Sequence, residues 1–506
     1  MTSHGWLGAI YVVLSVAMIG WDILMAGRIA QLRRIPRAFQ AITGIAGLLI
    51  LPALVVAYTA QSLLYSRAIL FVSWLWPFTA LLFVLQTIYA LTRRLVTPML
   101  GFPLLVYNAI IATVAVTKFV ITRGNSPAEF GLALNAAQAS MLGTFFGLPA
   151  LWNPIYLQVP LFAPSLPARW GFTRLVRVGL AGAAIAMTAL VLVELPGAYA
   201  DIRSYAPHDK DQLQEHPDGD FRIGLKIFPD LRGGPPPVAI RYDLDLADTL
   251  NVDAISIVID PEAARGIPLD SIARSLEVAR ADSTLLIVAL GYPKDALKEM
   301  KASREGYTTA RLKDIDRIAR RLKPDYLIPA VDPLEEGERI LGAQAPQYWI
   351  DYFSRAARVA HYIYPRIKVA VPMSSYGSRD STLYAWAAQR GSPIDVMGFS
   401  LLAGFDGARS LDTHLRVAQR WMRLYPNPKE HWVFAAGGYP LVHGEQNQER
   451  AIKAVLAWAT AQTPIKGLVV YEGGDYTTVR GLRAPGGRLR PAVDEILVAE
   501  KGLRAH

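Results

Sequence analysis

Residues suited to acid–base chemistry follow a series of short apolar runs in the second half of the sequence. They are Asp260, Glu262, Tyr292, Asp332, Glu335, Glu336, Ser374, Ser375, Tyr376, Ser400, Tyr439, His443, Glu472 and Asp475. A pair of carboxyl groups can protonate and attack a glycosidic bond, and aromatic faces can hold a sugar ring. The composition of this set therefore favours saccharide chemistry.

The runs themselves predict the elements that position these residues. Eight segments rich in β-branched and apolar residues are expected to be strands, at 221–229, 254–262, 285–293, 325–333, 368–376, 394–402, 430–438 and 466–475. Amphipathic segments at helical spacing lie between them. This alternation predicts a parallel sheet, and eight units predict an α/β fold closed into a (β/α)8 TIM barrel. A doubly wound open sheet is the alternative, because it shows the same alternation.

In a barrel of this kind the site lies where the strands end. The sequence nominates Asp332 and Glu472 as the catalytic carboxylates of an active enzyme. The candidate substrate-binding residues are Tyr292, Glu335, Tyr376, Tyr439 and Asp475. A purely structural role stays open for both carboxylates, as a loop cap for Asp332 and as a buried ion-pair or hydrogen-bond partner for Glu472.

Residues 221–476 resemble the large clan of (β/α)8 glycoside hydrolases. That clan places its acid/base Glu in an Asn-Glu pair at the end of strand four, and its nucleophile Glu at the end of strand seven, often as Glu-Thr-Gly-Tyr-Pro. Residues 330–333 (AVDP) match the strand-four position but not its residues. Residues 434–440 (FAAGGYP) match the Gly-Tyr-Pro ending, and Ala436 stands where the resemblance puts the nucleophile.

Alanine has no carboxylate and cannot form a covalent glycosyl intermediate. We therefore expect a catalytically degenerate barrel, a pseudoenzyme that serves as an accessory, structural or saccharide-binding subunit of a membrane complex. The alternative is an active glycoside hydrolase that acts on envelope or extracellular saccharides, with Asp332 and Glu472 as its carboxylate pair. An inverting arrangement tolerates a wider separation of the two carboxyl groups.

No cofactor or metal is expected from the sequence. The chain has no cysteine, its histidines are scattered without HExxH spacing, and it lacks GxGxxG and Walker motifs. His361 and His414 fall within helical segments, where packing or surface roles are the commoner assignment.

The first 200 residues differ from the rest in composition. Apolar runs of near-membrane-spanning length recur at 6–25, 41–63, 68–91, 99–120, 130–151 and 178–199. These predict a bundle of about six transmembrane helices; helices buried in a soluble core, or a cleaved signal peptide for the first run, are the alternatives. Asp22 and Glu194 lie at the ends of runs, and a transport role for them is the weaker interpretation.

Arginine placement predicts the orientation of the bundle. The loops at 28–37, 93–94 and 169–177 hold most of its arginines and would share one side of the membrane. The positive-inside rule then puts the N-terminus and the barrel on the periplasmic or extracellular side. Because this explains much of the net charge of +10, a nucleic-acid partner is not expected; lipid, other integral membrane subunits and a saccharide are. The predicted domains are 1–200 (transmembrane), 201–220 (polar linker) and 221–506 (barrel).

Overall fold

The computed structural model describes residues 20, 21, 29, 32, 35–59, 74–123, 160, 205–216, 220–228, 235, 237–279, 284–402, 408–440, 444–476, 480–484 and 487–504. The chain divides into two compact units, whose main parts are residues 1–200 and residues 201–484 with 489–506.

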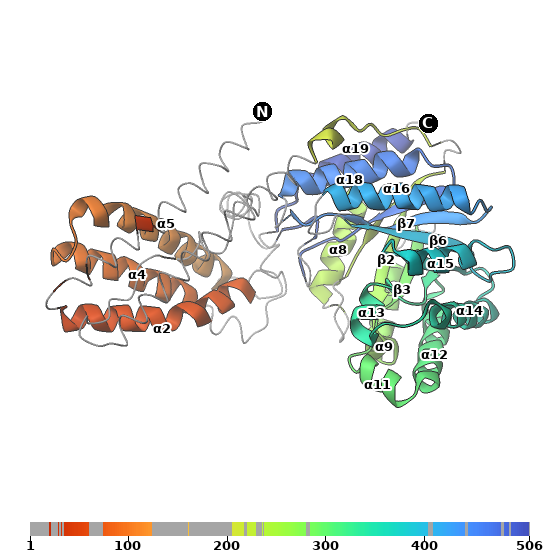
Figure 1. The fold of residues 1–506 in the computed structure, drawn as a ribbon, viewed down its shortest axis with the longest axis horizontal. Coiled ribbons are helices and arrows are strands. Elements are labelled where there is room, and N and C mark those ends of the chain that lie inside the picture. Colours follow the sequence, from red (N-terminus) through yellow and green to blue (C-terminus); the bar gives the residue numbers. More distant parts are fainter. Residues whose placement is uncertain are drawn as a thin grey trace. The chain divides into compact units, whose positions relative to one another are not determined.

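The second unit is built on a closed barrel of parallel strands (Figure 1). The strands are β1 (Arg222–Lys226), β2 (Ala254–Ile259), β3 (Leu285–Leu290), β4 (Tyr326–Ile328), β5 (Lys368–Met373), β6 (Val396–Leu402), β7 (Glu430–Gly437) and β8 (Ile465–Val470). Each pairs with the next in order, and β8 pairs with β1. The predicted barrel is therefore confirmed, and the open-sheet alternative is excluded.

Helices follow the strands and cover the barrel. They are α8 (Pro237–Leu250), α9 (Pro261–Ala264), α10 (Ile267–Ala279), α11 (Ala296–Ala302), α12 (Arg304–Leu322), α13 (Glu336–Leu341), α14 (Pro346–Ile363), α15 (Ser378–Ala387), α16 (Ala408–Leu424), α18 (Glu445–Thr460) and α19 (Ala492–Arg504). A large apolar cluster fills the layer between strands and helices, which explains why the strands are apolar on successive residues.

The inside of the barrel is filled by side chains, so it is a packed core. A second apolar cluster there includes Tyr326, Trp432 and Phe434. Glycines on the neighbouring strands make room for the aromatic rings. A Cβ on Gly467 would lie 2.5 Å from Trp432 Cζ3, and a Cβ on Gly398 would lie 2.0 Å from Phe434 Cδ2.

Part of the predicted polar linker packs on the barrel. Residues 205–216 contain the short helix η3 (Ala206–Lys210), and Tyr205 is buried. Arg450 of α18 donates from Nε and Nη2 to the Asp209 carboxylate at 2.6 and 2.8 Å. The barrel unit therefore begins before its first strand.

The described part of the first unit contains α2 (Arg37–Thr59), α4 (Leu75–Thr92) and α5 (Pro98–Arg123), which lie side by side (Figure 1). Polar side chains join them internally: Gln86 donates to Thr43 at 2.7 Å, and Asn108 donates to Thr87 at 3.2 Å. The exposed large apolar residues of these helices and their N-terminal caps are Ile45, Leu48, Trp74, Phe78, Leu81, Leu85, Ile88, Met99, Phe102, Val106 and Ile110.

These helices coincide with the second, third and fourth predicted spans. By length and composition, Leu75–Thr92 is the one helix of the described residues suited to cross a membrane; Arg37–Ile50 and Pro98–Thr113 are shorter apolar segments. The fifth and sixth predicted spans, and all but residues 20 and 21 of the first, lie outside the described residues. A six-span bundle is thus not confirmed.

Candidate functional site at the carboxyl end of the barrel

The carboxyl end of the barrel, meaning the carboxyl-terminal ends of the strands and the loops that follow them, gathers the candidate residues. Asp332 follows β4, and Ser400 of β6 donates its hydroxyl to Asp332 Oδ1 at 2.7 Å. Because β5 lies between β4 and β6 in the barrel, this bond passes over one strand. Asp332 also has φ of 35°, a left-handed backbone that costs energy for a residue with a side chain. The chain therefore holds this carboxyl group in one place.

The environment of Asp332 makes it a candidate proton donor. Desolvation raises its pKa from 3.8 to about 7, and the nearby charges of Glu335, Glu336 and Asp380 also raise it, whereas the Ser400 hydrogen bond opposes the shift. A carboxyl group with a pKa near neutrality can give or take a proton at physiological pH.

Arg480 brings positive charge to the carboxylates that follow β4 from the opposite side of the barrel. It belongs to the connection between β8 and α19, and β8 is half a turn away from β4. Its guanidinium lies over the Tyr439 ring, 4.0 Å from the centroid, and 5.6 Å from the centroid of Tyr471. Burial lowers the Arg480 pKa to about 10, while Glu335, Asp332 and Glu336 oppose that shift. The guanidinium thus lies within electrostatic range of the β4 end.

Glu472, the second proposed catalytic carboxylate, is buried in an ion pair. Lys226 Nζ of β1 lies 3.6 Å from Glu472 Oε2, and the same ammonium lies 3.9 Å from the centroid of the Tyr471 ring. Beside it, burial raises the pKa of Asp243 to about 7, with a contribution from the Glu472 charge. Glu472 is therefore bound on the β1 side, whereas Asp332 is bound on the β6 side.

The carboxyl end of strand β7 (Glu430–Gly437) supplies no carboxylate; Glu430 lies at its amino end, where it accepts from Tyr326 and Lys368. Ala436 is fully buried in the apolar cluster between strands and helices, in register with Leu401 and Val470 of the same cluster. The next residue is Gly437, where a Cβ would lie 2.7 Å from the Tyr471 carbonyl oxygen. An acidic side chain at position 436 would thus enter an apolar cluster, and one at position 437 would meet backbone.

The predicted substrate-binding residues fall into two groups. Tyr439 and Glu335 lie near Arg480. Tyr376 lies at the ends of β5 and β6: its ring stacks on His414 with centroids 4.2 Å apart, and its hydroxyl donates to the Ser400 carbonyl at 3.0 Å. Desolvation raises the Glu335 pKa, and Arg480 opposes the shift.

The other two predicted binding residues are engaged inside the fold. Tyr292 is buried, and its hydroxyl donates to the Val331 carbonyl at 2.8 Å. Asp475 is buried in a two-point ion pair with Arg490, with oxygen–nitrogen distances of 2.9 and 2.6 Å. Both residues shape the loops around the site.

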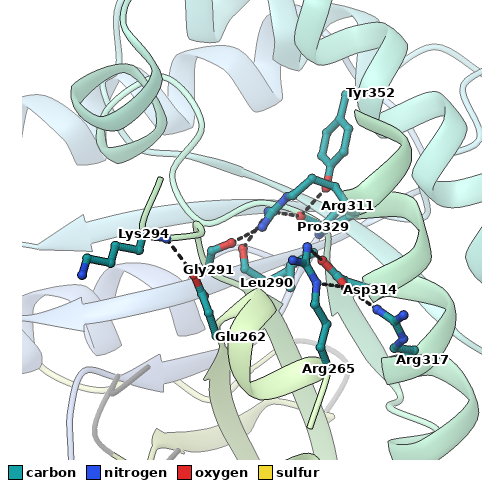
Figure 2. Close-up of polar contacts among 10 residues, drawn as sticks. All are labelled: Glu262, Arg265, Leu290, Gly291, Lys294, Arg311, Asp314, Arg317, Pro329 and Tyr352. Carbon is teal, nitrogen blue, oxygen red and sulfur yellow. Dashed lines mark hydrogen bonds and ion pairs between the residues drawn. The ribbon is translucent and has the colours of Figure 1, made fainter. Parts of the chain in front are cut away.

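A buried arginine supports the β3 and β4 ends from the helix layer (Figure 2). Arg311 of α12 donates to the carbonyls of Gly291, Leu290 and Pro329, and the Tyr352 hydroxyl also donates to Pro329, at 2.8 Å. These bonds tie carbonyl groups at the ends of β3 and β4 to the helix layer, and the Leu290 carbonyl also accepts from the Val331 N–H. They fix the segment that leads to Asp332.

Sequence reasoning did not single out Arg480, Lys226 or Arg311. Residues 477–491, after the eighth strand, are rich in Gly and Arg and resemble a long loop, and nothing in the sequence pairs them with the fourth strand. Among the described residues, no three or more His, Asp or Glu side chains form a metal-binding group.

Neither a family model nor a curated protein sequence matches this chain. Solved structures do. A GH5_18 protein from Bifidobacterium longum subsp. longum in complex with Manb1-4GlcNAc has a TM-score of 0.46 and 13% identity, over 56% of this chain and 79% of that one. A GH5_18 protein from Streptomyces cattleya in complex with GlcNAc has a TM-score of 0.46 and 12% identity, over 58% and 82%. The GH39 enzyme from Xanthomonas axonopodis pv. citri has a TM-score of 0.43 and 13% identity, over 57% and 67%. The fold that the sequence resemblance predicts, a closed barrel of parallel strands, is the one that residues 222–470 form.

Proposed function

We propose that this protein is a membrane-anchored barrel that binds a saccharide at its carboxyl end without hydrolysing it, as an accessory subunit of a membrane complex. The observation that carries the proposal is the end of β7. Glycoside hydrolysis with retention needs a second carboxylate about 5 Å from the acid. Ala436 packs against the helices, and backbone closes the position of Gly437.

The state of Glu472 adds support. A nucleophile or base must reach the substrate or a water molecule next to it. Glu472 is only 2% exposed, and its carboxylate lies beside the Lys226 ammonium. This pairing fits a structural carboxylate at the β8–β1 seam better than a reacting one.

Saccharide binding is supported by the ring faces and acceptors that remain. Tyr439 and Tyr471 lie at the ends of neighbouring strands, and Asp332 and Glu335 add oxygen acceptors at the opposite side. Sugar rings stack on aromatic faces and offer hydroxyl donors to carboxylates.

Membrane anchoring is supported by the polarity of α2, α4 and α5. Their buried side chains include hydrogen-bonded Thr, Gln and Asn beside an apolar core, and their exposed residues include many large apolar side chains. An exposed apolar surface together with buried polar links suits a lipid surrounding. One helix is enough to anchor a protein, so a bundle of several helices also favours packing against helices of partner subunits. With the arginine distribution, the proposal places the barrel on the periplasmic or extracellular side.

Hydrolysis and binding can be separated on the full chain purified in mild detergent. We expect a measurable dissociation constant by calorimetry for at least one of the neutral β-1,4-linked hexasaccharides of glucose, mannose or xylose, and no release of chromophore from aryl glycosides of these sugars. Turnover that Asp332→Asn and Glu472→Gln each abolish would refute the non-catalytic proposal.

That result would favour the second candidate, an active glycoside hydrolase with Asp332 and Glu472 as its pair. One specific observation speaks for it: the pKa of Asp332 is raised to about 7, as a general acid requires. A stable set of subunits that co-purifies with the chain from native membranes would instead favour the accessory role.

The absence of cysteine makes the orientation testable with single-cysteine variants. Lys301 is exposed on the barrel unit, and Arg93 is exposed after α4. In intact cells a membrane-impermeant maleimide should label Lys301→Cys and not Arg93→Cys, while both should react after the membrane is permeabilised. The opposite pattern, or equal labelling in intact cells, would refute the proposed orientation.

A further inference from the structure

Arg480 lies where a bound saccharide would stack. Its guanidinium is 4.0 Å from the centroid of Tyr439 and 5.6 Å from that of Tyr471, the two rings that follow β7 and β8. Planar guanidinium groups bind ring faces through both stacking and charge. A sugar ring uses the same faces, so the two cannot occupy them together.

The main chain at Arg480 is held in place independently of its side chain. Gln448 of α18 donates its amide to the Arg480 carbonyl at 2.7 Å. The following residues are bound to the β8 end: Gly481 donates its N–H to Asp475 Oδ1 at 2.8 Å, and Leu482 donates to the Glu472 carbonyl at 2.8 Å. None of these backbone bonds involves the guanidinium, so truncating the Arg480 side chain leaves them in place.

The site would favour Arg480 in its present position while no ligand is bound. The carboxylates after β4 lie within electrostatic range of the guanidinium, and Glu335, Asp332 and Glu336 all contribute. Glu336 also has Arg339 as an ion-pair partner, and Asp332 accepts from Ser400, so Arg480 adds a second source of positive charge to this acidic group. The side chain thus both covers the rings and balances local charge.

We propose that Arg480 is a built-in occupant of the saccharide site, an autoinhibitory contact that a ligand must displace from Tyr439 and Tyr471. The inference rests on the proposed saccharide binding and adds how that binding is restrained. Affinity then contains the cost of moving the guanidinium off the rings. Removing the side chain removes that cost.

The test compares the full-length wild type with Arg480→Ala in detergent, using calorimetry with the neutral hexasaccharides of glucose, mannose and xylose. Arg480→Ala should bind about fivefold more tightly or better, the change expected for loss of a cation–π contact worth about 1 kcal/mol. Adding Tyr439→Leu to Arg480→Ala should abolish the gain. Arg274→Ala, at an exposed arginine of α10, is the matched control and should leave the affinity unchanged.

The outcomes separate this inference from the proposed function. Wild-type binding that weakens or stays the same in Arg480→Ala would overturn the autoinhibitory role and leave saccharide binding standing. Saccharide binding seen only in Arg480→Ala would strongly support the autoinhibitory role of Arg480. Absence of binding in both proteins, with melting temperatures showing both are folded, would overturn saccharide binding and the inference with it.

Discussion

Restoring an acidic residue at the end of β7 should damage the barrel. Ala436 is fully buried between strands and helices. A Glu there must stay neutral to fold. At pH 7 the protonation of a group with an ordinary pKa of about 4.3 costs roughly 3.7 kcal/mol, at about 1.36 kcal/mol per pKa unit. Overpacking adds about 1–3 kcal/mol. Ala436→Glu should therefore lose roughly 5–7 kcal/mol of unfolding free energy.

The neutral variant Ala436→Gln separates charge from size. It carries nearly the same bulk, so the difference between the Glu and Gln variants reports the cost of protonation. That difference should be about 3.7 kcal/mol at pH 7 and about 1 kcal/mol at pH 5, because a raised folded pKa penalises the carboxylate increasingly as pH rises above its unfolded value. Pulse proteolysis of the full chain in urea measures both. Equal stability of the two variants at pH 7 would show that position 436 reaches water and would refute the packing argument.

Three further results are expected. Because the folded pKa of Asp332 is raised from 3.8 to about 7, its ionisation lowers stability as pH rises through that window; Asp332→Asn should raise the melting temperature relative to wild type more at pH 8 than at pH 4.5. Lys226→Met should leave the Glu472 carboxylate without its nearby cation and cost about 3–5 kcal/mol by the same urea assay, and adding Glu472→Gln should recover part of the loss. Arg490→Leu should uncouple Asp475 and cost a similar 3–5 kcal/mol, with faster limited proteolysis of the connection between β8 and α19.

The sequence predicted the barrel well because its signals are local and repeated. Each strand needs a short run that is apolar on both faces, and each helix needs an apolar stripe. β4 shows the limit of this reasoning, since only Tyr326–Ile328 forms a strand within the predicted 325–333. The remaining residues turn toward the site, where Asp332 adopts its left-handed conformation.

The site was harder to predict because residues of the same type serve either the candidate site or the packing of the fold. Tyr292, Tyr439, Asp332 and Asp475 all follow strands. Tyr292 bonds to the Val331 carbonyl and Asp475 to Arg490, partners that are 39 and 15 residues away in the chain. A sequence shows that a strand ends in an acid or a tyrosine, but the side chain's direction depends on which distant group it meets.

The structure at the end of β7 is stronger evidence against a nucleophile than the missing residue type alone. The sequence could show that Ala436 lacks a carboxylate, and a carboxylate elsewhere on the strand could in principle replace it. The register with β6 and β8 turns position 436 toward the helices, and the Tyr471 carbonyl closes position 437. Neither position can regain a nucleophile by a single substitution without a shift of the backbone. The loss of the nucleophile at this strand is therefore built into the packing of the barrel. Of the carboxylates that remain at the carboxyl end, those after β4 lie within electrostatic range of Arg480, and Glu472 is paired with Lys226 of β1.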